Sequence, residues 1–230
     1  MWTRQELKGI GKTALKANYW KSVIAAFLLA LLAGGVYTSS RSQSIDVDVS
    51  SESLQQGAQS IPVEAIPFIT GALLIILLIA LVLKIFIFNP LKVGCFSFFR
   101  KNVTDPGTKL DMILSGFSQY GRTFVTLFLS DLYVFLWCLL LVIPGLMKAY
   151  SYRLVPYILA DDPELSPREV LEKSQQMMDG QRWNAFVYDL SFLGWEILGA
   201  LTFGVVNLLW TNPYKENADA ALYLRLRGEI

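Results

Sequence analysis

Long apolar stretches alternate with short polar segments along most of the chain. Residues 19–37, 66–88 and 124–143 are each mostly apolar over a length that suits a membrane crossing, because a helix needs about 20 such residues to span a hydrocarbon core of about 30 Å. Residues 186–210 are long enough but contain two carboxylates and are interrupted by glycines, so they can form more than one element. Residues 146–160 are shorter and charged, so hydropathy alone does not decide whether they cross.

An internal repeat helps to decide whether these two segments cross the membrane. Three units share one layout, in which a small residue and an aromatic precede an apolar span, and a returning helix carries a proline followed by a bulky residue. Each match involves few residues, so chance similarity between apolar helices is the alternative. We therefore expect an all-α, polytopic helical membrane bundle of six segments, arranged as three helical hairpins. A bundle of four or five spans, with residues 146–160 in the interface, is the competing arrangement.

Positive charge indicates how such a bundle is oriented. Lys and Arg gather before the first span, after the second and fourth, and at the C-terminus, whereas the external loop at 38–65 has the single basic residue Arg41. Because cytoplasmic segments retain Lys and Arg, both termini are predicted to be cytoplasmic in a multi-pass protein of the cell membrane. The chain is then one membrane domain, residues 1–230, with these parts: a basic interfacial helix at 1–18, a first hairpin at 19–100, a second unit at 108–161 and a third at 166–228.

Amphipathic helices are predicted on the cytoplasmic side. Residues 5–16 place apolar side chains along one side and lysines along another, as an interfacial helix on anionic lipid does. Ser166, Pro167 and Glu169 have the types and spacing of an N-cap, a first helical residue and a capping box. They predict a helix over residues 167–179, and residues 110–120 are expected to behave similarly.

Composition supports the membrane assignment and excludes most enzyme classes. The chain of 230 residues is 53% hydrophobic and 17% charged, with a net charge of +1 and no histidine. Without histidine, the usual general base and the commonest metal ligand are missing. Cys95 and Cys138 both lie in apolar runs, which favours reduced thiols. We expect no enzyme, no cofactor, no metal site and no nucleic-acid partner.

Charges inside the predicted spans are the sharpest functional candidates, because ionised groups at membrane depth are costly unless they are paired or hydrated. Counting along helices from the external turns places Arg153 and Glu196 about 12 Å deep, where they could pair. Asp131 and Asp189 occupy similar places in their repeats and could line one polar pocket. Polar contacts that hold helices together are the alternative interpretation.

Turn and proline motifs form a second candidate set. Prolines in the returning helices are expected to kink them and free backbone carbonyls. The motif and kink residues are Pro144, Gly145, Pro156, Tyr157, Pro213 and Tyr214.

The motifs around these residues resemble a known family. They include residues 143–145, Tyr150-Ser151-Tyr152, residues 156–163, residues 189–195 and Pro213-Tyr214. This pattern is similar to the bacterial integral membrane family known only as domain of unknown function 975. The family often has a small residue near the position of Glu196. The resemblance implies a cell-membrane protein from a Gram-positive bacterium and brings no established activity, substrate or catalytic residue.

The function expected from the sequence is therefore that of a membrane protein without enzymatic activity. It would bind membrane lipid or a partner membrane protein, which can be a second copy of the chain. The alternative is a small transporter or proton-coupled permease subunit that uses the intramembrane carboxylates.

Overall fold

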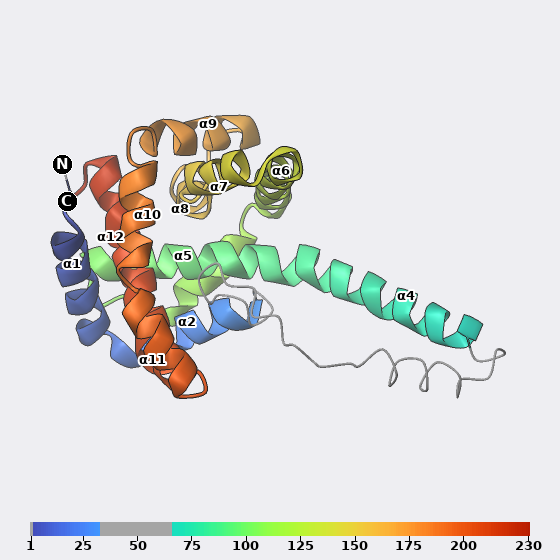
Figure 1. The fold of residues 1–230 in the computed structure, drawn as a ribbon, viewed down its shortest axis with the longest axis horizontal. Coiled ribbons are helices and arrows are strands. Elements are labelled where there is room, and N and C mark those ends of the chain that lie inside the picture. Colours follow the sequence, from blue (N-terminus) through green and yellow to red (C-terminus); the bar gives the residue numbers. More distant parts are fainter. Residues whose placement is uncertain (1, 33–65) are drawn as a thin grey trace.

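The computed structural model describes residues 2–32 and 66–230, and every element in these ranges is a helix (Figure 1). The all-α prediction is confirmed. The predicted external loop at 38–65 and the end of the first predicted span, residues 33–37, lie outside the described residues.

The chain begins with two helices that meet at a sharp bend. Helix α1 (Arg4–Ala17) starts after Thr3, whose side chain accepts a hydrogen bond from the backbone N–H of Glu6 at 3.2 Å. Such a cap satisfies one of the free donors of the first helical turn. Helix α2 (Tyr19–Leu32) follows at 107° to α1, with Asn18 between them. These helices correspond to the predicted interfacial helix and to the start of the first predicted span.

The prolines of the returning helices follow π-helical turns or a break in the helix. A π-helical turn at Lys84–Phe88 joins α4 (Ile66–Leu83) to α5 (Asn89–Thr104), and another at Asn207–Thr211 precedes α12 (Asn212–Arg227). Pro90 and Pro213 stand two residues after these π-helical turns, inside helical backbone that is continuous over residues 66–104 and 205–227. The change in hydrogen-bond pattern at a π-helical turn accommodates a proline, which has no N–H. Pro156 stands in the first turn of α8 (Val155–Asp161), after a break that follows α7 (Val142–Ser151).

The other helices follow the sequence pattern closely. A 3-10 helix (Leu110–Phe117) leads to α6 (Tyr120–Leu140). Helix α9 (Pro167–Met177) has the predicted capping box, in which Ser166 and Glu169 exchange hydrogen bonds. The undecided segments are both divided: residues 146–160 between α7 and α8, and residues 186–210 among α10 (Arg182–Leu190), α11 (Leu193–Leu201) and the second π-helical turn.

The core is built where the three proline-led helices α5, α8 and α12 pack together (Figure 1). The ring of Tyr157 stacks on that of Tyr223, with centroids 5.1 Å apart, and meets the edge of Phe96 at 4.8 Å. All three rings are buried. The chain termini lie side by side because α1 packs on α12 (Figure 1), and the Arg225 guanidinium is 2.8 Å from the Glu6 carboxylate.

Among the described helices, α6 is long and apolar enough to cross a membrane, and α1 with α2 qualifies only if the bent pair counts as one broken span. The described helices also run in several directions. In Figure 1 the continuous rod of α4 and α5 follows the long axis, α10 and α11 cross it, and α6 is seen nearly end on. The six-span bundle therefore stays a prediction.

Candidate functional site

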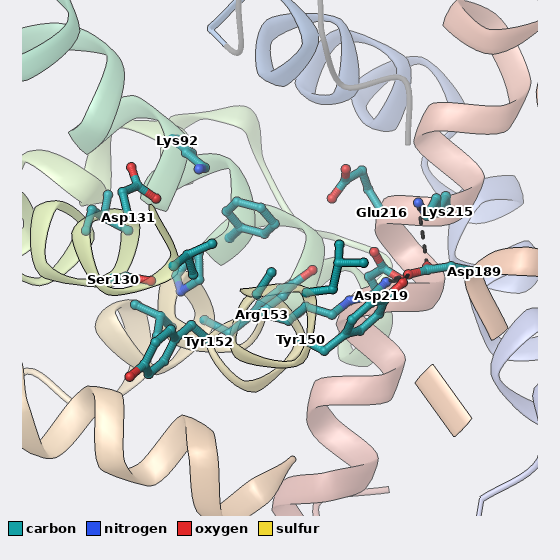
Figure 2. A pocket seen from close by; sticks show the side chains of 18 of the residues that line it. Lys92, Ser130, Asp131, Tyr150, Tyr152, Arg153, Asp189, Lys215, Glu216 and Asp219 are labelled. Atoms are coloured by element: carbon teal, nitrogen blue, oxygen red, sulfur yellow. Dashed lines mark hydrogen bonds and ion pairs between the residues drawn. The ribbon is translucent and has the colours of Figure 1, made fainter. Parts of the chain in front are cut away.

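A cavity of about 670 Å³ opens between α5, α6, α7, α8 and α12 (Figure 2). Part of the lining is apolar and aromatic, with side chains such as Phe96, Leu127 and Phe135. The rest of the lining contains an unusual number of ionisable groups: Lys92, Asp131, Arg153, Asp189, Lys215, Glu216 and Asp219. This mixture of apolar and charged lining is typical of ligand sites, in which a few polar groups orient an otherwise apolar molecule.

Arg153 is the centre of the charged part. Its guanidinium donates to both carboxylate oxygens of Asp189, at 2.8 and 3.0 Å, and to Oδ1 of Asp219 at 2.7 Å. The side chains are largely buried, with 16% of Arg153 and 20% of Asp189 exposed. A planar guanidinium suits such fork-like contacts, which are stronger than neutral hydrogen bonds.

The local fold explains how Arg153 reaches both carboxylates. It stands in the short break between α7 and α8, at the point where Pro156 starts the next helix. Asp189 comes from the end of α10, and Asp219 comes from the middle of α12. The Tyr150 hydroxyl donates to Asp189 at 2.9 Å, which fixes the carboxylate further. The cluster therefore ties three separate segments of the chain together.

Lys215 adds a second cation to the cluster, with its Nζ atom 3.6 Å from Oδ1 of Asp189. Lys215 and Asp219 are four residues apart on α12, so both lie on the helix face that meets α10. Two cations therefore face two carboxylates in this part of the lining.

Glu216 differs from the carboxylates of the cluster. Its side chain comes from α12, the residue is 8% exposed, and its Oε2 atom has no hydrogen-bond partner among the described residues. Figure 2 shows it between the Arg153 cluster and the opposite end of the cavity, where Lys92 and Asp131 lie. A buried carboxylate oxygen without a donor is unfavourable, because burial removes its water.

Asp131 lies on α6, beside the buried Ser130, and is exposed. Among the described residues no ion pair involves Asp131. With all groups ionised, the cavity lining has three cations and four carboxylates. When Glu216 is ionised, the lining therefore carries one negative charge in excess.

The structure brings together three of the four predicted intramembrane groups. Asp131, Arg153 and Asp189 line the same cavity. The suggested pair of Arg153 with Glu196 is wrong, because Arg153 binds Asp189 and Asp219. Glu196 lies in the first turn of α11 and is not among the residues that line the cavity.

The predicted motif residues take structural positions around the cavity. Pro144 and Gly145 are in the first turn of α7, where Gly145 packs so closely on Cys138 that a Cβ atom would come within 2.2 Å of its Sγ. Pro156 and Tyr157 form part of the lining, and Pro213 and Tyr214 begin α12.

Four ionisable residues of the lining were not predicted as site residues: Lys92, Lys215, Glu216 and Asp219. Lys215 was expected to snorkel near the end of a span. A signal for three of them was present, since Lys215, Glu216 and Asp219 are charges at neighbouring positions of one helix in a mostly apolar chain. The sequence did not show which face of that helix meets α10.

A separate buried network holds the N-terminal helices to the body. The Asn102 amide nitrogen donates to Oδ1 of Asn217 at 2.7 Å, and the Asn18 amide donates to Oδ1 of Asn102 at 2.8 Å. Asn217 also donates to the hydroxyl of Ser22 at 3.2 Å. These side chains are all buried, so this network joins α2, α5 and α12 without facing the cavity.

A second polar junction anchors the C-terminal end of α12. Asp161 lies 2.8 Å from Arg100 and 3.0 Å from Arg227, and it accepts a hydrogen bond from the Tyr223 hydroxyl at 2.7 Å. Asp162 pairs with Lys173 at 2.9 Å. The Asp161-Asp162 motif therefore has a structural role at this junction.

Comparison with known proteins gives one match. A family model described as "Protein of unknown function (DUF975)" matches residues 138–229. The match confirms the resemblance seen in the sequence over helices α7 to α12, and it includes the whole Arg153 cluster and Glu216. No curated protein and no solved structure matches the chain.

Proposed function

We propose that this chain, whose residues 138–229 match the DUF975 family, is a membrane-embedded protein without enzymatic activity that binds a lipid or lipid-like amphiphile in the cavity beside Arg153. The observation that carries this proposal is a cavity of about 670 Å³ that is lined by both apolar and charged side chains. An amphiphile has the same division between an apolar body and a polar head.

Exposed apolar side chains support the membrane assignment. Along α4, large apolar side chains are exposed on successive residues, including Phe68 at 78% and Ile76 at 62%. The end of α6 and the start of α7 continue this pattern from Leu139 to Ile143. Apolar surface of this extent on a water-soluble protein would favour aggregation, whereas a lipid environment stabilises it.

The proximity of the termini supports an even number of crossings. Because α1 packs on α12, both ends of the chain lie on one side of any membrane that the chain crosses. This favours four or six segments over five. The excess of Lys and Arg near both ends supports the proposal that this side faces the cytoplasm of a bacterial cell.

The paired state of Arg153 favours binding over catalysis. Asp189 is held by Arg153, Tyr150 and Lys215, so its carboxylate is occupied as an acceptor. General acid-base catalysis needs a group that can exchange a proton with the substrate. The cluster instead forms a rigid polar wall against which a head group can be positioned.

The transporter alternative has one specific observation in its favour, which is that Asp131 and the buried Glu216 line the same cavity. It predicts that Asp131→Asn and Glu216→Gln each abolish solute uptake in proteoliposomes while the protein stays folded. Lipid binding without uptake by the wild-type protein would count against it.

The proposed function is tested by extracting the protein with its native lipid and measuring bound lipid by native mass spectrometry. In Ala149→Trp, a bulky ring would fill part of the cavity that Ala149 lines. The matched control is Ala200→Trp, at an exposed residue of α11 outside the lining. We expect stoichiometric lipid on the wild-type and control proteins and its loss from Ala149→Trp. Equal lipid on all three, or none on the wild type, would contradict the proposal.

A further inference from the structure

Glu216 is a group of the cavity lining whose hydrogen bonding is incomplete among the described residues. Arg153 and Lys215 are engaged by Asp189 and Asp219, within 3.6 Å. Glu216 keeps a buried Oε2 atom that receives no hydrogen bond from a described residue. A ligand that donates an N–H to this oxygen would remove an unsatisfied acceptor from the interior.

The charges of the lining indicate that the donating group of the ligand is positively charged. Four carboxylates face three cations, and Asp131 stands at the cavity without an ion-pair partner among the described residues. A cationic group on a ligand would be attracted to the carboxylates of this lining. A cation also interacts favourably with aromatic faces, and Tyr150, Tyr152 and Phe135 are part of the same lining.

The apolar residues of the lining indicate that the rest of the ligand is apolar. Leu127, Val134 and Phe135 come from one side of α6, and Phe135 is 62% exposed. The cavity volume of about 670 Å³ falls within the range of small-molecule sites, roughly 300–1,000 Å³. This surface suits an acyl or alkyl chain that enters along α6.

We propose that the cavity selects amphiphiles with a primary ammonium head, which Glu216 binds through its free carboxylate oxygen while the apolar chain lies along α6. The inference rests on the proposed function and names the chemical class of its ligand. An aminolipid head group and a free alkylamine share this chemistry. Anionic amphiphiles would meet the excess negative charge, and neutral alcohols would lack the charge that Glu216 and Asp131 attract.

The chain contains a natural reporter for occupancy of this cavity. Cys138 lines the cavity and is exposed, whereas Cys95 is fully buried. Burial raises the pKa of the Cys95 thiol to about 12, so that thiol stays protonated and unreactive. The chain has two cysteines, so the rate of modification by N-ethylmaleimide reports on Cys138.

The experiment measures this rate for the full-length protein in dodecyl maltoside micelles, with a series of added amphiphiles. Dodecylamine and phosphatidylethanolamine carry a primary ammonium. Phosphatidylcholine carries a cation without N–H, and dodecanol, dodecyl sulfate and phosphatidylglycerol are neutral or anionic. We expect protection by at least one of the two primary ammonium compounds and little by the other four. Protection by dodecylamine alone identifies a free amine, and protection by phosphatidylethanolamine identifies an aminolipid head group; both support the proposal.

Two variants connect the protection to the carboxylates. Glu216→Gln keeps the side-chain shape but loses the charge, and it should weaken protection roughly tenfold or more, as expected for a hydrogen bond to a buried charged group. Asp131→Asn, at an exposed residue, should weaken it by a smaller factor and serves as the second test if Glu216→Gln does not fold. The control Glu172→Gln removes one charge from the exposed surface of α9 and should leave protection unchanged.

The outcomes separate this inference from the proposed function. Equal protection by anionic or neutral amphiphiles, or unchanged protection in both cavity variants, overturns the ammonium class while lipid binding stands. No protection by any amphiphile, although native lipid copurifies with the protein, also overturns this inference alone. No protection together with no copurified lipid overturns both.

Discussion

The guanidinium of Arg153 holds both carboxylate oxygens of Asp189, at 2.8 and 3.0 Å, across 36 positions of sequence. This contact joins the break between α7 and α8 to the end of α10, and Asp219 extends it to α12. Three segments that the sequence separates are thus fixed around one charged group, and the cavity opens beside it.

Arg153→Ala should destabilise the fold strongly. The change leaves Asp189 and Asp219 close together and largely buried with one cation, Lys215, nearby. Removing one partner of a buried ion pair costs about 3 kcal/mol. Thermal and denaturant unfolding of the purified protein measure the loss. Glu196→Gln is the control and should change stability by less than about 0.5 kcal/mol. A larger loss of stability in Glu196→Gln than in Arg153→Ala would contradict the pairing of Arg153 with Asp189 and Asp219.

Gly94→Ala should be among the most disruptive small changes in the chain. A Cβ atom at Gly94 would lie 1.7 Å from the backbone oxygen of Ile113, so α5 and the 3-10 helix Leu110–Phe117 would have to separate. Overpacking of this kind costs about 3 kcal/mol. At Gly121 a Cβ atom would meet nothing within 4 Å, so Gly121→Ala is a matched control that should lose no stability. Equal melting temperatures for the two variants would contradict the close packing at Gly94.

The sequence predicted the helices well and the contacts between them less well. Capping and hydropathy are local signals, so α1, α6 and α9 appeared close to their observed positions. The pair Arg153–Glu196 was wrong because depth was counted along straight helices. The chain breaks between α7 and α8 and again between α10 and α11, which changes both depth and direction.

Part of the cavity was foreseeable and part was not. Equivalent positions in a repeat suggested that Asp131 and Asp189 line one pocket, and both do. Glu216 and Asp219 were missed because α12 has charged and apolar residues on several faces. Only its packing against α1, α2 and α5 determines which face turns toward the cavity.

Acid should remove part of the stability that the capping box of α9 provides. Hydrogen bonds from the side chain and the backbone N–H of Ser166 hold the pKa of Glu169 below its usual range. A lowered pKa in the folded state means that the stabilisation is present above the unfolded pKa and is lost as the pH falls through the folded pKa.

The test compares the melting temperatures of the wild-type protein and Glu169→Gln between neutral and acidic pH. Glutamine keeps the capping geometry without the charge, and other carboxylates titrate equally in both proteins. The wild type should melt higher at neutral pH, and the difference should vanish in acid. A difference that does not change with pH would show that the charge of Glu169 contributes nothing.

Both termini should lie in the cytoplasm. Helix α1 packs along α12, and Arg225 pairs with Glu6, so a membrane cannot separate the two ends. Reporter fusions that are active on only one side of the membrane, placed at each terminus in turn, measure this. Two cytoplasmic signals are expected. Signals from opposite sides would mean an odd number of crossings and would contradict the packing of α1 on α12.

The central claim is that lipid enters the cavity beside Arg153 and does not only surround the exposed helices. Photoactivatable lipid, crosslinked in membranes and located by peptide mass spectrometry, tests it most directly. We predict crosslinks on the peptides of α6 and α7 that line the cavity and on exposed α4. Ala149→Trp should abolish the cavity crosslinks and preserve those on α4. Crosslinks confined to α4, or cavity crosslinks unchanged in Ala149→Trp, would contradict the account.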